Sequence, residues 1–256
     1  HPIPVFAEMS SLNPVFVLPE AIRERGAAIA QGLVASFTLG MGQFCTKPGL
    51  IVAPAAQVDA LATLLRREMS AAGEMYLLTA KIRDAYLAAV EELRCQPGTD
   101  AWVGESAGAP SVPACLLVAD AATYLTTPAL RAELFGPATV LVGVRDLGEL
   151  GDLLAGLEGS LTATVHGDPT DPWVSTAVAR LAPRVGRLVF GGVPTGVTVD
   201  AAMHHGGPYP AASSGRYTSV GDDAIARFLR PICYQDFPAA LLPTALLSTT
   251  QDAPIG

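Results

Sequence analysis

Charged residues are scarce in this chain of 256 amino acids. Asp, Glu, Lys and Arg make up 16% of it, against about 25% in an ordinary soluble domain, while 50% of its residues are hydrophobic. A chain with so few charges is expected to cover part of its surface with another subunit or domain. The composition therefore favours subunit or domain contacts, and a homo-oligomer is expected.

Long hydrophobic runs and basic clusters are also missing. No apolar run approaches the roughly 18 residues that a membrane-spanning helix needs, and Arg, Glu, Gly and Pro interrupt the alanine-rich stretches. With a formal net charge of −8 and no cluster of Lys and Arg, the chain has little with which to neutralise a phosphate backbone. The sequence therefore predicts partners other than membranes and nucleic acids.

Cysteine spacings typical of metal sites or disulfide frameworks are absent. The four cysteines are Cys45, Cys95, Cys115 and Cys233, with no C-x-x-C pair among them. They are expected to be free thiols in a reducing cytoplasm. The first residues, HPIPVF, include neither an initiator methionine nor the pattern of a signal peptide, which suggests that the chain was cut from something longer.

Short apolar runs alternate with segments of helical periodicity along most of the chain. Strands are expected at 50–53, 115–118, 138–144, 161–165 and 187–190, and helices at 20–37, 54–72, 79–94, 146–157 and 173–182. The alternation is typical of an α/β fold with an open, mostly parallel, twisted sheet and helices on both of its faces. One more helix and a short strand are expected after residue 221.

Residues 191–221 interrupt this alternation. They are rich in Gly, Pro, Ser and His and contain no apolar run of strand length. A loop of about thirty residues is too long for a mere connection in a compact domain, so a functional role is expected.

Cys45 stands out because its neighbours are poor formers of regular structure. Gly40 and Gly42 precede it and Pro48-Gly49 follows it, so an irregular turn with free backbone N–H groups is expected. This context favours a reactive thiol, although free cysteines are most often inert core residues. Glu8 taken singly is more often a solvated surface residue than a catalytic one.

Four short motifs follow one another over nearly the whole chain. They are AEMSSLNPVFV from residue 7, GQFCT from residue 42, AELFGPA from residue 132 and HHGGPYPAASSGR from residue 204. In this order they resemble the catalytic half of an NAD(P)-dependent aldehyde dehydrogenase. The stretches PTGVTV, HGGPYPA and SVGDDAIARFLRPICYQ are more similar still to the branch that oxidises 2,5-dioxopentanoate, also called α-ketoglutarate semialdehyde, to 2-oxoglutarate.

The resemblance implies a role for several residues. Cys45 would attack the aldehyde carbon as a thiolate, its backbone N–H would help to hold the oxyanion, and the hydride would pass to NAD or NADP. Glu8 would activate the water that hydrolyses the thioester, a role suited to a carboxylate whose pKa burial has raised toward neutrality. Glu133 would bind the nicotinamide ribose, and Phe135 would pack beside the nicotinamide ring.

Several of these residues have plainer interpretations. Glu133 could flank a loop, and Phe135 could be an ordinary core aromatic. His204, His205 and Arg216 are the candidates for binding the charged end of the substrate, although Arg216 is about as well explained as a surface arginine. The two histidines lack the spacing of a zinc site, so no metal is expected.

The resemblance also implies an incomplete enzyme. In the family, the nucleotide-binding domain and an oxyanion-binding asparagine precede the general-base Glu, whereas this sequence begins shortly before Glu8. Residues 1–14 are expected to be a remnant of that domain, 15–235 the catalytic domain and 236–256 a tail. Such a fragment is expected to fold but to show no turnover with NAD(P).

Two other functions are compatible with the sequence. A CoA-acylating aldehyde dehydrogenase would transfer the thioester to coenzyme A, but Glu8 argues against it because such a site must protect its thioester from water. The other is a non-catalytic assembly module in which Cys45 is merely buried, and slow thiol labelling at neutral pH would reveal it.

Overall fold

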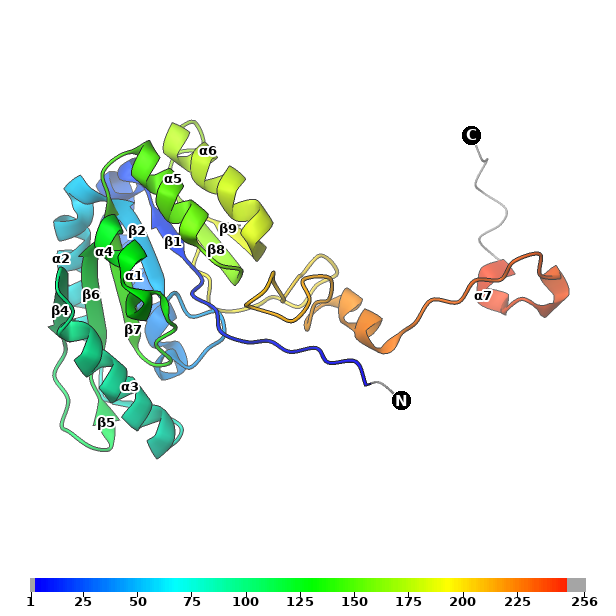
Figure 1. Cartoon of the computed structure of the whole chain (residues 1–256), viewed down its shortest axis with the longest axis horizontal. Coiled ribbons are helices and arrows are strands. Elements are labelled where there is room, and N and C mark those ends of the chain that lie inside the picture. The colour runs from blue at the N-terminus through cyan, green and yellow to red at the C-terminus, as the bar shows by residue number, and fades with distance from the viewer. Residues whose placement is uncertain (1–2, 248–256) are drawn as a thin grey trace. The chain divides into compact units, whose positions relative to one another are not determined.

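A seven-stranded sheet forms the centre of the chain, whose residues 3–247 are described by the computed structural model (Figure 1). The strand order is β4-β6-β7-β2-β1-β8-β9, and all neighbouring pairs are parallel except β4 and β6. The strands are β1 Val15–Val17, β2 Leu50–Pro54, β4 Thr99–Val103, β6 Cys115–Asp120, β7 Ala138–Val144, β8 Ser160–His166 and β9 Val185–Phe190. The prediction of an open, mostly parallel sheet is confirmed.

Helices cover both faces of this sheet, as predicted. β2, β7 and β8 are buried along their whole length, which requires a layer on each side of them. The α-helices of this region are α1 Pro19–Thr38, α2 Val58–Ser70, α3 Ala80–Arg94, α4 Ala121–Thr126, α5 Leu147–Gly156 and α6 Pro172–Leu181. α1 packs against α2, and α5 lies beside α6 (Figure 1).

Polar side chains mark where several helices begin. The hydroxyl of Thr79 accepts a hydrogen bond from the backbone N–H of Ile82 and caps α3, as predicted. Asp120, Asp146 and Asp171 cap α4, α5 and α6 in the same way. Each cap satisfies one backbone N–H group that the first turn of a helix leaves without a partner.

Smaller elements complete the described region. β3 Met75–Tyr76 pairs antiparallel with β5 Ser111–Val112 in a second sheet. The 3-10 helices are η1 Leu39–Gly42, η2 Ala55–Gln57, η3 Pro128–Arg131, η4 Ala182–Arg184, η5 Asp222–Phe228 and η6 Ala239–Leu241, and the last helix is α7 Thr244–Leu247. Within residues 3–247, no helix combines the length and the hydrophobicity needed to cross a bilayer.

The chain divides into two compact units, His1–Ala224 and Ile225–Gly256. In the described part of the second unit, Tyr234 packs edge to face against Phe237. The predicted tail helix is the 3-10 helix η5, and the predicted strand after it is absent from residues 229–247. The apolar side chains there are exposed and no strand pairs with them, so the prediction of a strand was wrong.

Two segments that precede neighbouring strands reach the same edge of the sheet. β1 and β2 are parallel, and Val15 lies opposite Ile51. Glu8 and Cys45 precede these two paired residues by nearly equal lengths of chain. Because parallel strands begin at one edge, the strand pairing carries the two residues toward each other.

The predicted long loop, residues 191–221, also returns to this edge. All of it is described, and it contains no helix or strand beyond an isolated bridge between Ala212 and Glu8. It packs closely on the start of β8 and β9, since a Cβ atom on Gly207 would lie 2.5 Å from the carbonyl oxygen of Ser160. Glycine is required at such an approach.

Candidate active site

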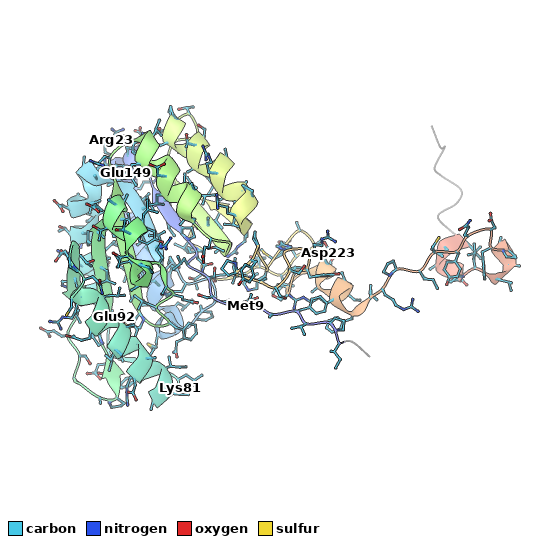
Figure 2. All side chains as sticks on the ribbon, in the orientation of Figure 1. Met9, Arg23, Lys81, Glu92, Glu149 and Asp223 are labelled. Atoms are coloured by element: carbon cyan, nitrogen blue, oxygen red, sulfur yellow. The ribbon has the colours of Figure 1, made fainter. Side chains whose placement is uncertain are left out.

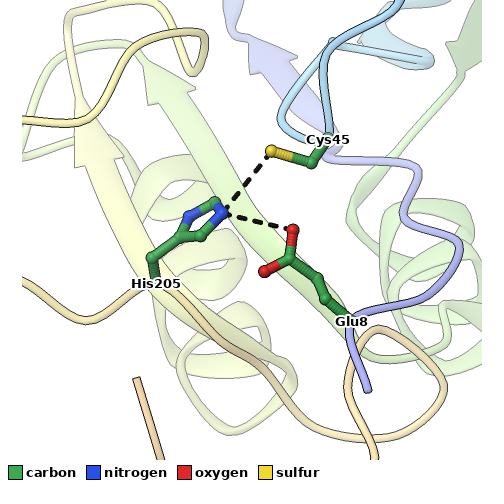
Figure 3. Close-up of side chains that lie close together, drawn as sticks. All are labelled: Glu8, Cys45 and His205. Atoms are coloured by element: carbon green, nitrogen blue, oxygen red, sulfur yellow. Dashed lines mark hydrogen bonds and ion pairs between the residues drawn. The ribbon is translucent and has the colours of Figure 1, made fainter. Parts of the chain in front are cut away.

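Three side chains from distant parts of the sequence meet at this edge (Figure 3). The Sγ atom of Cys45 lies 3.5 Å from Nε2 of His205, and Oε1 of Glu8 lies 3.3 Å from the same nitrogen. His205 is buried and Cys45 is half-buried, whereas the Glu8 side chain keeps 29% of its surface exposed. The expected nucleophile, the expected base and one substrate-binding candidate thus form one cluster.

These contacts shift the protonation of two of the three groups. Hydrogen bonding to Cys45 and then to Glu8 raises the pKa of His205 to about 9, despite its burial. The pKa of Glu8 is lowered, chiefly by its hydrogen bond with His205, which outweighs desolvation. At neutral pH the cluster therefore holds an imidazolium beside a carboxylate. The expectation that burial raises the pKa of Glu8 was wrong, because that contact dominates.

His205 is held by the end of the long loop. Its backbone N–H donates to Oγ1 of Thr218 at 2.7 Å, and its carbonyl oxygen accepts from the backbone N–H of Ser219 at 2.8 Å. The Ser219 hydroxyl also lies 3.4 Å from Oε2 of Glu8. The loop therefore fixes the imidazole and approaches the carboxylate as well.

The stability contribution of His205 should depend on pH. Its pKa rises from an ordinary value of 6.5 to about 9 on folding, so the native state binds the proton more tightly than the unfolded state does. This contribution is fully present below pH 6.5 and is lost as the pH rises through 9. In urea unfolding, the stability difference between the wild type and His205→Gln is expected to shrink over that window. A pH-independent difference would show that the imidazole is not protonated in this way.

Cys45 lies in an irregular turn, as predicted. Gly40 and Gly42 have φ angles of 57° and 73°, in the left-handed region that favours glycine. The turn at Cys45 is closed by a hydrogen bond of 3.1 Å from the backbone N–H of Lys47 to the carbonyl oxygen of Phe44. Because the thiol is half-buried, it does not fit the alternative of a merely buried core cysteine.

Asn13, which the sequence did not single out, joins the segments around the cluster. It is fully buried, and its Nδ2 group donates to the carbonyl oxygens of Cys45 at 2.8 Å and Lys47 at 3.0 Å. Its Oδ1 atom accepts from the Ser11 hydroxyl at 2.7 Å and from the backbone N–H of Thr162 at 3.3 Å. One amide therefore links the Cys45 turn to β8 and to the segment after Glu8.

Lys47 is a second residue that the sequence did not single out. Its buried Nζ group donates to the carbonyl oxygens of Leu134 at 2.6 Å and Ala138 at 2.9 Å. Burial lowers its pKa to about 8, and the charge of Glu133 opposes this shift. Lys47 thus ties the Cys45 turn to the AELFGPA motif.

Replacing Lys47 by methionine is expected to lower the free energy of unfolding by about 1–3 kcal/mol. The substitution keeps an unbranched side chain but leaves two buried carbonyl groups without their donor. The measurement is urea unfolding at pH 7. Lys81→Met is the matched control, because Lys81 lies exposed on α3 (Figure 2), and it should change stability by less than about 0.5 kcal/mol. Equal effects of the two variants would contradict the role of Lys47.

The two expected cofactor-binding residues lie together but apart from the cluster. Glu133 is half-buried and accepts a hydrogen bond from the backbone N–H of Ser11 at 3.2 Å. Phe135 is 40% exposed, so it is not an ordinary core aromatic. Both residues line a cavity of about 490 Å³ against α3, and Cys45 does not belong to its lining.

The other substrate-binding candidates do not join the cluster. The His204 ring lies beside Gly206, where a Cβ atom would come within 3.2 Å of its Nε2 atom, and Arg216 is exposed. A different cation, Arg187 on β9, is electrostatically coupled to Cys45. Its guanidinium donates to the carbonyl oxygens of Pro194 and Gly196, and its pKa is lowered chiefly by burial.

Comparison with curated proteins finds aldehyde dehydrogenases, although no protein-family model matches the chain. The chain is 46% identical over 250 residues to "Alpha-ketoglutaric semialdehyde dehydrogenase 2" of Azospirillum brasilense, and 43% identical over 255 residues to "Alpha-ketoglutaric semialdehyde dehydrogenase" of Acinetobacter baylyi. Over nearly its whole length the chain is therefore similar to part of two aldehyde dehydrogenases. Each alignment covers 96% of this chain and 48% of the relative, so the chain spans about half the length of the curated relatives it matches.

Solved structures give the same fold. A gamma-glutamyl-gamma-aminobutyraldehyde dehydrogenase from Burkholderia cenocepacia superposes with a TM-score of 0.73 at 17% identity, over 87% of this chain and 45% of that one. An NAD-dependent aldehyde dehydrogenase from Sinorhizobium meliloti superposes with a TM-score of 0.67 at 18% identity, over 86% and 43%. At these identities the likeness establishes the aldehyde dehydrogenase fold for most of this chain.

Proposed function

We propose that this chain is the catalytic part of an NAD(P)-dependent aldehyde dehydrogenase that oxidises an aldehyde to a carboxylic acid. The observation that carries the proposal is the meeting of Cys45 and Glu8 at one imidazole, with the thiol half-buried and the carboxylate partly exposed. A nucleophile and a base within reach of one another form the constellation that thioester chemistry needs. The relatives named above support the reaction class.

The chemistry assigned to the chain has two stages. In the first, the Cys45 thiolate attacks the aldehyde carbon, and loss of hydride from the resulting thiohemiacetal leaves a thioester on Cys45. In the second, Glu8 accepts a proton from the water that attacks the thioester, and the carboxylic acid leaves. The lowered pKa of Glu8 keeps its carboxylate ionised at neutral pH, so it is ready to take that proton.

We place the nicotinamide ribose of NAD or NADP at the cavity between α3 and the AELFGPA motif, from which the ring would have to reach the carbon bound to Cys45. A carboxylate and a partly exposed aromatic ring line that cavity, and they suit a ribose hydroxyl group and a nicotinamide ring. Glu133 would hold the ribose, and Phe135 would position the ring. When bound, the cofactor supplies the acceptor for the hydride.

A cofactor-free assay tests this proposal on the chain itself. An activated ester such as p-nitrophenyl acetate acylates a reactive thiol without hydride transfer, so the reaction reports only the nucleophile and the base. We expect a burst of about one equivalent of p-nitrophenolate, followed by slower turnover as the acyl group is hydrolysed. A chain that gives no burst would overturn the assignment of Cys45.

For the substrate we propose 2,5-dioxopentanoate, the α-ketoglutaric semialdehyde in the names of both curated relatives. A short substrate with a carboxylate at its far end needs cations within reach of that end while its aldehyde carbon lies at the thiol. His205 and Arg187 supply them, since both interact with Cys45. Arg187 thereby replaces the exposed Arg216 as our candidate.

Protection of Cys45 from iodoacetamide tests this substrate. Because a bound aldehyde blocks the thiol, 2,5-dioxopentanoate should protect at a concentration at least about 10-fold lower than uncharged pentanal does. Arg187→Gln should remove most of this advantage, whereas Arg216→Gln, in which an exposed arginine is changed, should keep it. Equal protection of the wild type by the two aldehydes would exclude the assignment.

The wider organisation of the parent protein belongs to the same proposal. We assign residues 15–235 to a catalytic domain, 1–14 to the neighbouring nucleotide-binding domain and 236–256 to a tail, of which 1–2 and 248–256 lie outside the described residues. The four cysteines are free thiols, which suits a reducing cytoplasm. The low charge content supports a homo-oligomer, which light scattering would detect.

A further inference from the structure

The cluster of Glu8, Cys45 and His205 supplies the donor set of a three-ligand zinc site (Figure 3). One sulfur, one ring nitrogen and one carboxylate oxygen lie within 4.8 Å of one another. Zinc takes all three kinds of donor, and zinc sites with three protein ligands keep a fourth position for water. The expectation of no metal considered the spacing of His204 and His205, whereas only His205 belongs to this cluster.

Two of the three distances between the ligand atoms agree with a tetrahedral ion. With a Zn–S bond of about 2.3 Å and Zn–N and Zn–O bonds of about 2.0 Å, the ligand atoms lie about 3.5 Å apart for S···N and about 3.3 Å apart for N···O. The corresponding distances here are 3.5 Å and 3.3 Å. The third distance, from the Cys45 sulfur to the Glu8 carboxylate oxygen, can shorten to the value that an ion requires by rotation of the partly exposed Glu8 side chain.

Hydrogen bonds satisfy these three groups less completely than a bound metal ion would. Both contacts of His205 use its Nε2 atom, which carries at most one hydrogen, so a single N–H group faces two acceptors. An ion at the centre would contact all three ligands at once. The charges of the ligands match that of the ion, because a thiolate and a carboxylate neutralise Zn²⁺; the guanidinium of Arg187 donates to the carbonyl oxygens of Pro194 and Gly196 and remains a positive charge nearby.

We propose that Glu8, Cys45 and His205 bind Zn²⁺ reversibly, with release of the Nε2 proton of His205 and the thiol proton of Cys45 and with water as the fourth ligand, and that the bound ion blocks the Cys45 thiol. The partly exposed carboxylate and the half-buried sulfur give the ion a path from solvent. Because the same groups carry the proposed catalysis, Zn²⁺ would inhibit the enzyme reversibly. The binding itself does not depend on that catalytic role.

The test uses the 256-residue chain with Cys95 and Cys233 changed to serine. Of the four cysteines these two are exposed and Cys115 is buried, so Cys45 remains as the accessible thiol. Co²⁺ is added as a spectroscopic probe, and we expect a sulfur-to-cobalt charge-transfer band together with the visible bands of a tetrahedral ion. Added Zn²⁺ should displace the cobalt, since it binds N and S donors more tightly.

Single variants identify the ligands. Cys45→Ser should abolish the charge-transfer band, and Glu8→Gln and His205→Gln should each weaken Zn²⁺ binding by at least about 10-fold, the loss that even outer-shell substitutions cause. His204→Gln is the matched control and should bind as the parent does. Circular dichroism checks folding. If His205→Gln fails to fold, the Zn²⁺ affinity of Glu8→Gln decides the test, because Glu8 lies in an exposed segment. A band that survives Cys45→Ser, or unchanged affinity in Glu8→Gln, would overturn the site.

Thiol labelling gives a second measurement. Zn²⁺ should slow the alkylation of Cys45 by iodoacetamide, and EDTA should restore the rate. Unchanged alkylation at a Zn²⁺ concentration that saturates the cobalt competition would contradict the proposed block. The ester burst of the metal-free chain reports the proposed catalytic role separately, so failure of either proposal can be recognised without the other.

Discussion

Replacing Cys45 by serine is expected to abolish the burst of p-nitrophenolate. Serine keeps the size of the side chain and its hydrogen bond to His205, but its hydroxyl is ionised far less than a thiol near pH 7. We expect the burst rate to fall by at least about 10³-fold, because removal of the nucleophile disables the whole catalytic unit. Stopped-flow absorbance at pH 7.5 measures it directly.

Cys95→Ser is the matched control for this prediction. Cys95 is an exposed thiol that follows α3, and its Sγ atom lies 3.9 Å from Oε1 of Glu91. It therefore also has a carboxylate neighbour but lacks a histidine at its sulfur in the described structure. The burst should remain unchanged in Cys95→Ser. A burst that survives in Cys45→Ser and disappears in Cys95→Ser would show that Cys95 is the nucleophile and would contradict the assignment of Cys45.

The sequence predicted best those elements whose environment is uniform. β2 and β7 are buried along their whole length, and their sequences LIVAP and ATVLVGV are short, mainly apolar runs that stand out from the helices around them. β8 is equally buried, but its sequence SLTATVH alternates apolar residues with Ser, Thr and His. β4 was missed because it is a partly exposed edge strand, and its sequence TDAWV has no such run. β1 was missed because three residues, VFV, are too few to show a period.

The site was predictable only in part. Motifs pointed to Cys45 and Glu8 separately, and the parallel pairing of β1 with β2 explains why their segments reach one edge. The contact with His205 depends on the path of the long loop across the starts of β8 and β9, which no local pattern encodes. The lowered pKa of Glu8 follows from that contact, so the sequence could not predict it either.

The supporting residues show why sequence reasoning overlooks positioning groups. Asn13 and Lys47 act through backbone carbonyl groups, so their partners carry no recognisable side-chain signature. A faint signal exists for each of them. Asn13 is a polar residue two positions before an apolar strand, and Lys47 is a lone cation in a glycine- and proline-rich turn, two positions after the cysteine. Buried polar groups in such places need partners, which is a reason to examine them.

Replacing Glu8 by glutamine is expected to separate the two stages of the reaction. Glutamine keeps the shape of the side chain and can still hydrogen-bond His205, so acylation of Cys45 and the burst should remain. It cannot accept a proton, however, so hydrolysis of the acyl group should slow by about 10²- to 10⁴-fold, the usual contribution of a general base. Burst amplitude and steady-state rate are read from one progress curve.

The pH dependence distinguishes a base from a merely structural residue. Because the hydrogen bond with His205 lowers the pKa of Glu8, the acid limb of the wild-type steady-state rate should lie below the ordinary glutamate value of 4.5. Glu8→Gln should lose this limb, whereas Glu92→Gln, a control on the exposed face of α3, should keep both the limb and the rate. If Glu8→Gln instead lost the burst while retaining the limb, Glu8 would serve the shape of the site and another group would activate the water. If Glu8→Gln both loses the acid limb and hydrolyses the acyl group slowly, the Glu8 carboxylate is the proton acceptor. Its contact with the imidazolium of His205 then sets the pH range over which it works.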